Sequence, residues 1–395
     1  MNQARIERQD GYTIYSTKLG NRQMVFTASI TDLNADSIAL CESIYEHIGR
    51  QIHQTKMHMV LERIFGKLDD ENQIQTARKT GLEKTGESPS DPFTFIQGSP
   101  IISTGLAGIQ VRAVDATNPD KIWPISYEGE IRGQGWRRNG TTYLLLQNIH
   151  GTAANQDNSR KAQTIRMFDR VLEILKSQGA DYRHVVRTWI YLSDILDWYP
   201  LFNKVRNEKY QEFGLIQNQA VPSKAESIYL PASTGIQGDN HMGAAGTMDI
   251  LAVVPGNDSC SEVIAISGKK QKSAFRYGSA FSRAMVIREP DVTQILISGT
   301  ASISEEGKTL YKGDSRAQIL KTLDVVDALV SSEGATLQDI AKATVFLKHQ
   351  KDYETYLKAM DEYGLSDFPA VVVQADICRS DLLFELDAVT VLDRD

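Results

Sequence analysis

An internal repeat limits the possible folds of this chain more than any other feature of its sequence. Residues 159–192 and residues 314–347 align without a gap, at a shift of 155 residues. Each segment has apolar residues at the spacing of an amphipathic helix, then a glycine suited to end that helix, then a run rich in β-formers. The two helix-ending glycines are Gly179 and Gly334. The repeat therefore predicts two copies of one helix–strand unit.

The predicted unit extends on both sides of this segment. A β-hairpin precedes each helix, and Asn139-Gly140 gives one of these hairpins a strong turn signal. A second helix follows the strand, and a proline, Pro222 or Pro369, then opens the closing strands. The predicted order is hairpin, helix, strand, helix and closing strands.

A third, more divergent copy precedes these two. Residues 1–115 show the same order of elements, and PIISTG (100–105) echoes PASTG (231–235). The last strands correspond as GIQVRAV, TMDILAVV and FELDAVTV, which matches Glu385 with Asp249 and Gln110. Chance similarity between generic α+β units stays open as the alternative for this first copy.

These observations predict an α+β fold of three tandem units, each a mixed β-sheet with two helices on one face. Segments rich in turn formers and charge at 115–127 and 255–275 separate the copies. We therefore expect units at residues 1–118, 119–258 and 259–395, arranged around a common axis with their helices outward. The last unit is expected to carry the chemistry.

Composition and cysteine usage exclude several classes of protein. A net charge of -7 argues against a general nucleic-acid binder, because neutralising phosphates needs a clustered basic surface. The three cysteines, Cys41, Cys260 and Cys378, are far apart and form no CxxC pair, which excludes a zinc ribbon or a disulfide framework. HExxH and paired-histidine spacings are absent, so we expect neither metal nor cofactor. No run approaches 18 apolar residues and the start lacks a secretory core, so we expect no membrane partner and a cytoplasmic location.

The third copy resembles the Rid family in the order and spacing of its segments. The similar stretches are GSAFSRA (278–284), ILISGTASI (295–303), KGDSRAQILKTL (312–323), DFPAVVV (367–373) and LLFELDAV (382–389). Rid proteins are small chorismate-mutase-like α+β subunits that form trimers with ligand clefts between neighbours. The resemblance implies a pseudo-trimer made by one chain, either monomeric or a low-order homo-oligomer. Deaminating Rid proteins have a carboxylate-binding arginine after the Pro-Ala of the closing strand, where this chain has Val371.

The second and third copies together resemble the chorismatases, hydrolases related to the Rid family that release pyruvate from chorismate. The similar stretches are RTWIYL (187–192), LPASTGI (230–236), RYGSAFSRA (276–284), LISGTASI (296–303) and ADICRSDLLFEL (375–386). This resemblance implies a small anionic metabolite, chorismate or a similar compound, as substrate.

Glu385 and Cys378 are the candidate catalytic residues. Protonating an enol ether needs a carboxylic acid that stays protonated near neutral pH, and Glu385 lies among Leu382, Leu383, Phe384 and Leu386. Chorismatases of the hydroxybenzoate-forming type are similar in having a cysteine seven residues before this glutamate. The alternatives are an exposed strand carboxylate for Glu385 and a small buried packing residue for Cys378.

Two substrate carboxylates require cations, and Arg283 and Arg379 are the best candidates. Arg187 is a weaker candidate because it opens a strand, where we expect it to be exposed. The loop LPASTGIQGDNHMGAAG offers backbone N–H groups and the Thr234 hydroxyl at Thr234-Gly235 for a carboxylate oxygen.

Trp189 and Tyr191 are candidate walls for the substrate ring, with core packing as the alternative. Three functions then compete. The first is a chorismatase-like hydrolase or lyase, the second a Rid-like enzyme acting on an enamine, an imine or another small metabolite, and the third a non-catalytic ligand-binding relative. Val371 speaks against ordinary deamination, and Glu385 with Cys378 favours the first function over the third.

Overall fold

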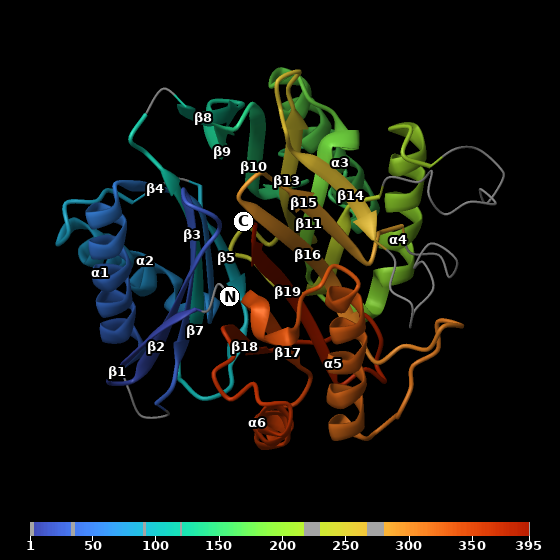
Figure 1. The fold of residues 1–395 in the computed structure, drawn as a ribbon. Helices are drawn as coiled ribbons and strands as arrows, with labels where there is room; N and C mark the ends of the chain where they lie inside the picture. The colour runs from blue at the N-terminus through green and yellow to red at the C-terminus, as the bar shows by residue number, and fades with distance from the viewer. Residues whose placement is uncertain are drawn as a thin grey trace.

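The computed structural model describes residues 4–32, 36–89, 92–118, 121–216, 230–266 and 280–394. Within these residues the chain forms three mixed β-sheets and six α-helices, and the helices lie outside the sheets (Figure 1). Pro222, expected to open the closing strands of the second unit, lies outside the described residues. No helix in the described ranges has the length and apolarity that a membrane crossing requires.

The first sheet has the strand order β1-β2-β3-β7-β4-β5. Its strands are β1 (Arg5–Gln9), β2 (Tyr12–Lys18), β3 (Gln23–Ile30), β4 (Met57–Gly66), β5 (Thr94–Gln97) and β7 (Leu106–Asp115). Helices α1 (Ser37–Thr55) and α2 (Glu71–Glu83) pack on one of its faces. The pairing of β4 with β5 is parallel, and the other pairings are antiparallel.

The second sheet has the order β12-β11-β13-β10-β9-β8. Its strands are β8 (Ile122–Tyr127), β9 (Glu130–Arg138), β10 (Thr141–His150), β11 (Val185–Leu192), β12 (Ala232–Gln237) and β13 (Gly246–Pro255), and its helices are α3 (Arg160–Ser177) and α4 (Ile195–Glu212). The side chain of Ser159 caps the N-terminus of α3, and Gly179 follows the helix in the left-handed conformation.

The third sheet has the order β14-β15-β16-β19-β17-β18-β6. Its strands are β14 (Glu262–Ile266), β15 (Ala284–Arg288), β16 (Val292–Ala301), β17 (Ile340–Leu347), β18 (Ala370–Gln374) and β19 (Phe384–Asp393), and its helices are α5 (Ser315–Ser331) and α6 (Tyr353–Glu362). The short strand β6 (Ser99–Pro100) comes from the first unit and pairs with β18. The same sheet pattern thus occurs three times, as the repeat predicts.

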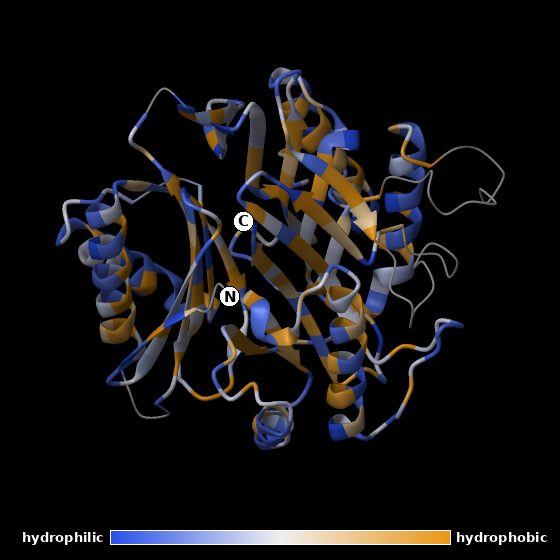
Figure 2. Cartoon of the chain, viewed as in Figure 1, coloured by the Kyte–Doolittle hydropathy of each residue, from blue (hydrophilic) through white to orange (hydrophobic). Residues whose placement is uncertain are grey.

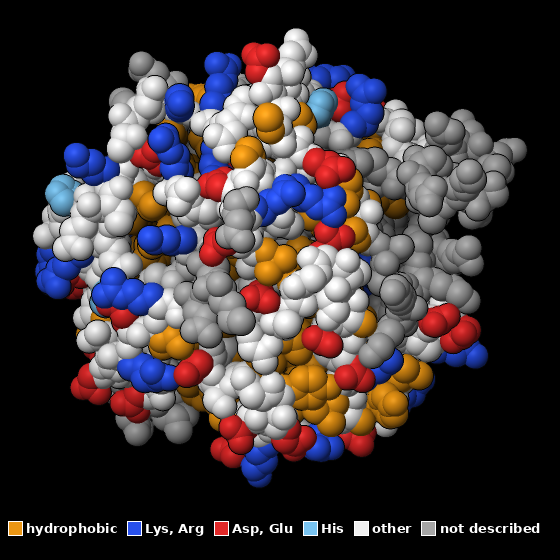
Figure 3. All heavy atoms as spheres, in the orientation of Figure 1, with side chains coloured by type: hydrophobic (Ala, Val, Ile, Leu, Met, Phe, Trp, Pro, Cys, Tyr) orange, Lys and Arg blue, Asp and Glu red, His pale blue; other side chains and the backbone are white. Residues whose placement is uncertain are grey.

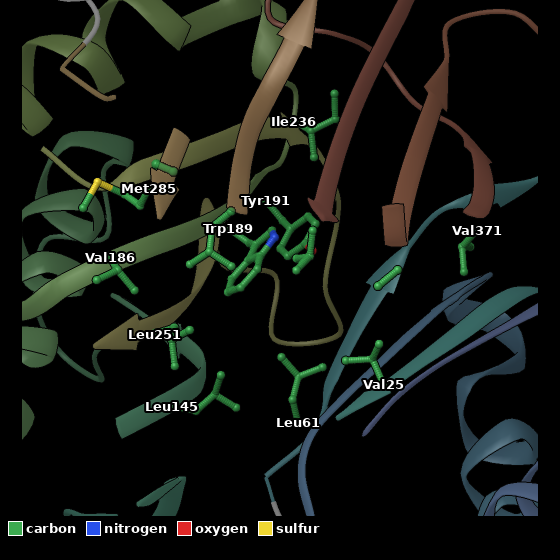
Figure 4. Packing of buried hydrophobic residues seen from close by; sticks show 14 of the residues in the cluster. Val25, Leu61, Leu145, Val186, Trp189, Tyr191, Ile236, Leu251, Met285 and Val371 are labelled. Atoms are coloured by element: carbon green, nitrogen blue, oxygen red, sulfur yellow. The ribbon is translucent and has the colours of Figure 1, made fainter. Parts of the chain in front are cut away.

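The three units close into a ring. The parallel edge of each unit packs on middle strands of the next unit's sheet: β5 and β4 on β10, β12 on β16, and β18 on β3 and β7. The strands are mostly hydrophobic, whereas the helices are striped (Figure 2). Each unit has its own core between sheet and helices, and a further core fills the centre, where strands of all three units meet (Figure 4).

The strand registers correct one expected correspondence. Glu385 in β19 pairs with Phe346 in β17, and Tyr191, the repeat equivalent of Phe346, pairs with Thr247. Thr247 therefore occupies the place of Glu385 in the second unit, and the match of Glu385 with Asp249 and Gln110 is wrong by two positions. A strand has a side-chain period of two, so a shift of two keeps the alternation and cannot be detected from it. The residue of the third unit that is equivalent to Asp249 and Gln110 is Asp387, not Glu385.

Candidate active site

A pocket opens where the second unit meets the third. Its cavity volume is about 50 Å³. Helix α4 and strand β12 form one wall, and β16, β19 and the segments before β15 and β19 form the other. The contact of β12 with β16 includes a hydrogen bond in which the Ser233 backbone N–H donates to Ser298 Oγ at 2.8 Å. The lining residues are Tyr199, Arg206, Ser233, Gly235, Phe281, Arg283, Gly299, Ala301, Ile303, Cys378, Arg379 and Glu385.

Glu385 is the acid of this pocket. It is the second residue of β19 and has an exposed fraction of 4%. Its carboxyl group lies directly over Gly299, where an added Cβ would approach Oε1 to 2.2 Å. Burial raises the pKa of Glu385 to about 8; the nearby Asp387 also raises it, and Arg187 lowers it. The structure therefore gives a carboxyl group that is mostly protonated at neutral pH, rather than an exposed strand carboxylate.

A buried group of three polar side chains lies behind Glu385. Arg187 Nη2 donates to Thr234 Oγ1 at 2.6 Å and lies 3.3 Å from Asp387 Oδ2. Thr234 Oγ1 in turn donates to Asp387 Oδ2 at 2.9 Å. The expectation that Arg187 is exposed is wrong, because the ring covers this face of β11. Thr234 lies behind the pocket wall, whereas its neighbour Gly235 lines the pocket.

Three arginines line the pocket. Burial lowers the pKa of Arg283 to about 10, which still leaves it charged at neutral pH. Arg379 Nη1 donates to the Gly307 carbonyl at 2.6 Å. Arg206 projects from α4 and donates to Asn203 Oδ1 at 2.6 Å. The sequence predicted Arg283 and Arg379, and these two meet here with a third cation from the other unit.

The sequence patterns did not indicate Arg206 and Tyr199. They are seven residues apart on α4, which is two helical turns, and so share one face. This spacing of seven residues could have indicated that both side chains line a site, but the same spacing is typical of any buried helix face.

Cys378 lines the pocket beside Glu385 and contacts two hydrophobic cores. Burial, followed by the charge of Glu385, raises the pKa of its thiol to about 12. A thiol with such a pKa stays neutral at pH 7 and is no thiolate nucleophile. Burial also raises the pKa of Tyr199, so that two neutral polar groups flank the acid.

Trp189 and Tyr191 do not line this pocket. Figure 4 shows both in the central core, among side chains from all three units. The guanidinium groups of Arg63 and Arg187 lie 4.5 and 4.7 Å from the Trp189 ring centroid, and Tyr191 packs edge-on against Phe65. In the structure both residues pack in the core, which is the alternative to a role as walls of the substrate pocket.

The equivalent positions at the other two interfaces lack the acid. Thr247 and Gly108 stand where Glu385 stands. Asp249, the equivalent of Asp387, binds Arg63 at 2.6 Å and accepts a hydrogen bond from Thr94 at 2.7 Å. The three clefts are thus chemically distinct.

Charges of both signs are mixed over the face shown in Figure 3, with no continuous basic patch. His241 lies 3.1 Å from Glu71 at the surface. Across the described ranges, no three His, Cys, Asp or Glu side chains are grouped to hold a metal ion.

Comparisons with known proteins find relatives of the last unit alone and relatives that match most of the chain. Residues 272–392 match the family model described as Endoribonuclease L-PSP. A RutC family protein of Pyrococcus abyssi is 30% identical over 96 residues, which cover 24% of this chain and 76% of that protein.

Two longer relatives come from Streptomyces. A chorismatase of Streptomyces rapamycinicus is 25% identical over 338 residues, covering 80% of this chain and 98% of the relative. A 3-hydroxybenzoate synthase of Streptomyces hygroscopicus is 25% identical over 316 residues, covering 73% and 87%. A crystal structure of a chorismatase has the same fold, with a TM-score of 0.59, 20% identity and coverage of 84% of this chain and 92% of that one. The chain therefore belongs to the Rid family, of which the Endoribonuclease L-PSP model and the RutC proteins are representatives.

Proposed function

We propose that this protein releases pyruvate from chorismate and that Glu385 is the general acid. The observation that carries this proposal is a buried carboxyl group with a pKa of about 8, placed in a pocket with three arginines. A general acid works best when its pKa lies near the working pH, because it then holds a proton and still gives it up readily.

In the proposed reaction the Glu385 proton is transferred to the terminal CH₂ carbon of the enol ether. The double bond supplies the electron pair for the new C–H bond, and the cation left behind is stabilised by the ether oxygen. Water adds to that cation, and the resulting hemiketal breaks the bond between its central carbon and the ring-bound oxygen. The ring oxygen keeps the electron pair and takes up a proton, which gives pyruvate and a dihydroxylated cyclohexadiene carboxylate. If this ring then loses one hydroxyl group and a ring proton as water, it aromatises, and the products are pyruvate and hydroxybenzoate with no net consumption of water. No cofactor is needed in either case.

The arginines account for binding. Chorismate has two carboxylates, and Arg206, Arg283 and Arg379 supply three positive charges around the pocket. Arginine is suited to this task because its planar fork binds a carboxylate through two hydrogen bonds. The cations also favour the binding of ionised substrate, while burial keeps Glu385 protonated.

The relatives support the same substrate and suggest the product. One is named a chorismatase and another a 3-hydroxybenzoate synthase, and both match most of this chain. Cys378 stands at the spacing that the hydroxybenzoate-forming type has, so we propose hydroxybenzoate as the ring product. Val371, at the position of the carboxylate-binding arginine in Rid deaminases, is fully buried in the central core, which argues against deamination.

The test is to incubate the purified protein with chorismate and to follow pyruvate with lactate dehydrogenase and NADH. Prephenate is the matched control, because this isomer of chorismate has no enol ether. We expect pyruvate to form from chorismate faster than its spontaneous release, and none to form enzymatically from prephenate. A folded protein that leaves chorismate unchanged would refute the proposal.

A further inference from the structure

A second cavity lies where the third unit meets the first. Its volume is about 340 Å³, within the range of about 300–1,000 Å³ that is typical of small-molecule sites. Helix α6 and strand β18 of the third unit form one wall. Strands β2 and β3 of the first unit, with the segment 101–107, form the other.

The registers show that this cavity is the repeat equivalent of the candidate active site, with different residues. Strand β18 takes the place of β12, so that Val372 stands where Gly235 stands. Tyr15 of β2 occupies the position of Arg283. Gly108 occupies the position of Glu385, and Val371 fills the space over it, with methyl carbons 2.8 Å from where a Cβ would be. The acid and a cation of the first pocket are thus replaced by a glycine and a tyrosine.

The lining suits an uncharged ring. Among the described residues, the lining contains no Lys, Arg or His, and Asp361 at the rim is its one charged side chain. The nearby Arg8 pairs with Asp367, so its charge is already compensated. Four aromatic side chains face the cavity together with aliphatic ones; they are Tyr15, Tyr353, Tyr356 and Phe368.

Two tyrosines of the lining offer polar groups to a ligand. Tyr15 and Tyr356 are largely buried, with exposed fractions of 9% and 4%, and both line the cavity. A phenol hydroxyl can both donate and accept a hydrogen bond. A bound molecule with a polar group would form hydrogen bonds with these hydroxyls, and its ring would bury the surrounding apolar surface.

We propose that this cleft is a second binding site, for an uncharged aromatic molecule with one hydrogen-bonding group, of the size of phenol or indole. The cleft has no carboxyl group to protonate a substrate and no cation to hold an anion, so it binds without the chemistry of the first pocket. Such a ligand contacts the first and the third unit at once and therefore stabilises the ring.

The test is calorimetric titration of the full chain with indole and, as an anion of similar size, benzoate. We expect indole to bind one molecule per chain and benzoate to bind at least about tenfold more weakly. The blocking variant is Ser366→Trp, because Ser366 is an exposed residue at the rim. The matched control is Leu201→Trp on α4, also exposed and outside the cleft.

Ser366→Trp is expected to weaken indole binding at least tenfold, and Leu201→Trp to change it less than twofold. A second variant, Leu357→Arg, places a cation beside the cavity at a residue that is 44% exposed, and it is expected to strengthen benzoate binding. The proposal is overturned if indole does not bind, if the blocking variant binds it as the wild type does, or if benzoate binds the wild type equally well.

Discussion

Replacing Glu385 by glutamine removes the proposed proton donor and keeps the shape of the side chain. Glutamine fits the space over Gly299 but has no acidic proton to transfer. General acid catalysis is commonly worth roughly 10²–10⁴-fold in rate, so the turnover of chorismate is expected to fall by about that factor. The affinity for chorismate is expected to change little, because the pocket arginines are untouched.

The structure sets the size of the effect through the pKa of Glu385. With a pKa of about 8, roughly nine in ten molecules hold the proton at pH 7, whereas with the ordinary value of 4.5 about one in 300 would. The rate constant kcat/KM is therefore expected to be constant below pH 7 and to fall as the pH rises through about 8.

The same group makes the stability of the fold depend on pH. Since the folded state holds the Glu385 proton more tightly than the unfolded state, the free energy of unfolding decreases as the pH rises from about 4.5 to about 8 and then levels off. The shift corresponds to roughly 5 kcal/mol at most. Glu385→Gln removes this cost, so the variant is expected to gain stability over the wild type between pH 5 and pH 8.

The assays are the coupled measurement of pyruvate, calorimetric titration with chorismate and thermal unfolding at pH 5 and pH 8. Glu83→Gln, an exposed residue of α2 in the first unit, is the matched control and is expected to behave as the wild type. Unchanged turnover in Glu385→Gln would remove this residue from the mechanism. An equal stability difference at both pH values would refute the buried, protonated carboxyl group.

Further substitutions test the rest of the pocket. Arg283→Met or Arg379→Met is expected to weaken chorismate binding by a free energy on the order of 1.5–3 kcal/mol, the contribution of one charge-assisted pair, and a titration that finds both variants unimpaired would refute the assignment. Cys378→Ala is expected to change the ring product, and chromatography that finds the wild-type product would leave Cys378 as a packing residue. Gly299→Ala places a methyl group 2.2 Å from Glu385 Oε1 and is expected to lower kcat at least tenfold in a protein whose circular dichroism is unchanged; wild-type kcat would contradict the close approach.

The parts of the fold that depend on local sequence patterns could be predicted from the sequence. The repeat at 159–192 and 314–347 predicted α3 with β11 and α5 with β17, because helical spacing, capping residues and glycine conformations are local properties. The boundaries of the three predicted units, near residues 118 and 258, stay a proposal. Each sheet takes all its strands from one predicted unit, except that β6 of the first unit joins the third sheet.

Only part of the site could be predicted from the sequence. The ring of three units decides which face of a strand lines the pocket, and the pattern of residues along the strand does not show this. Every residue of β11 is buried, so alternation could not place Trp189 and Tyr191 in the core instead of the pocket. Arg187 was expected at the surface because nothing in its neighbourhood reveals the covering third unit. Arg206 comes from the second unit, and its meeting with Glu385 depends on how the units pack.

The fate of the solvent proton tests the proposed protonation of the enol carbon most directly. If Glu385, which exchanges its proton with the solvent, protonates the enol carbon, the reaction in D₂O must place one deuterium in the methyl group of pyruvate. Lactate dehydrogenase traps the pyruvate as lactate before its methyl group exchanges, and mass spectrometry or proton NMR then counts the deuterium. We expect a singly deuterated methyl group; a methyl group without deuterium, formed by enzyme-catalysed release, would contradict protonation of the enol carbon by Glu385.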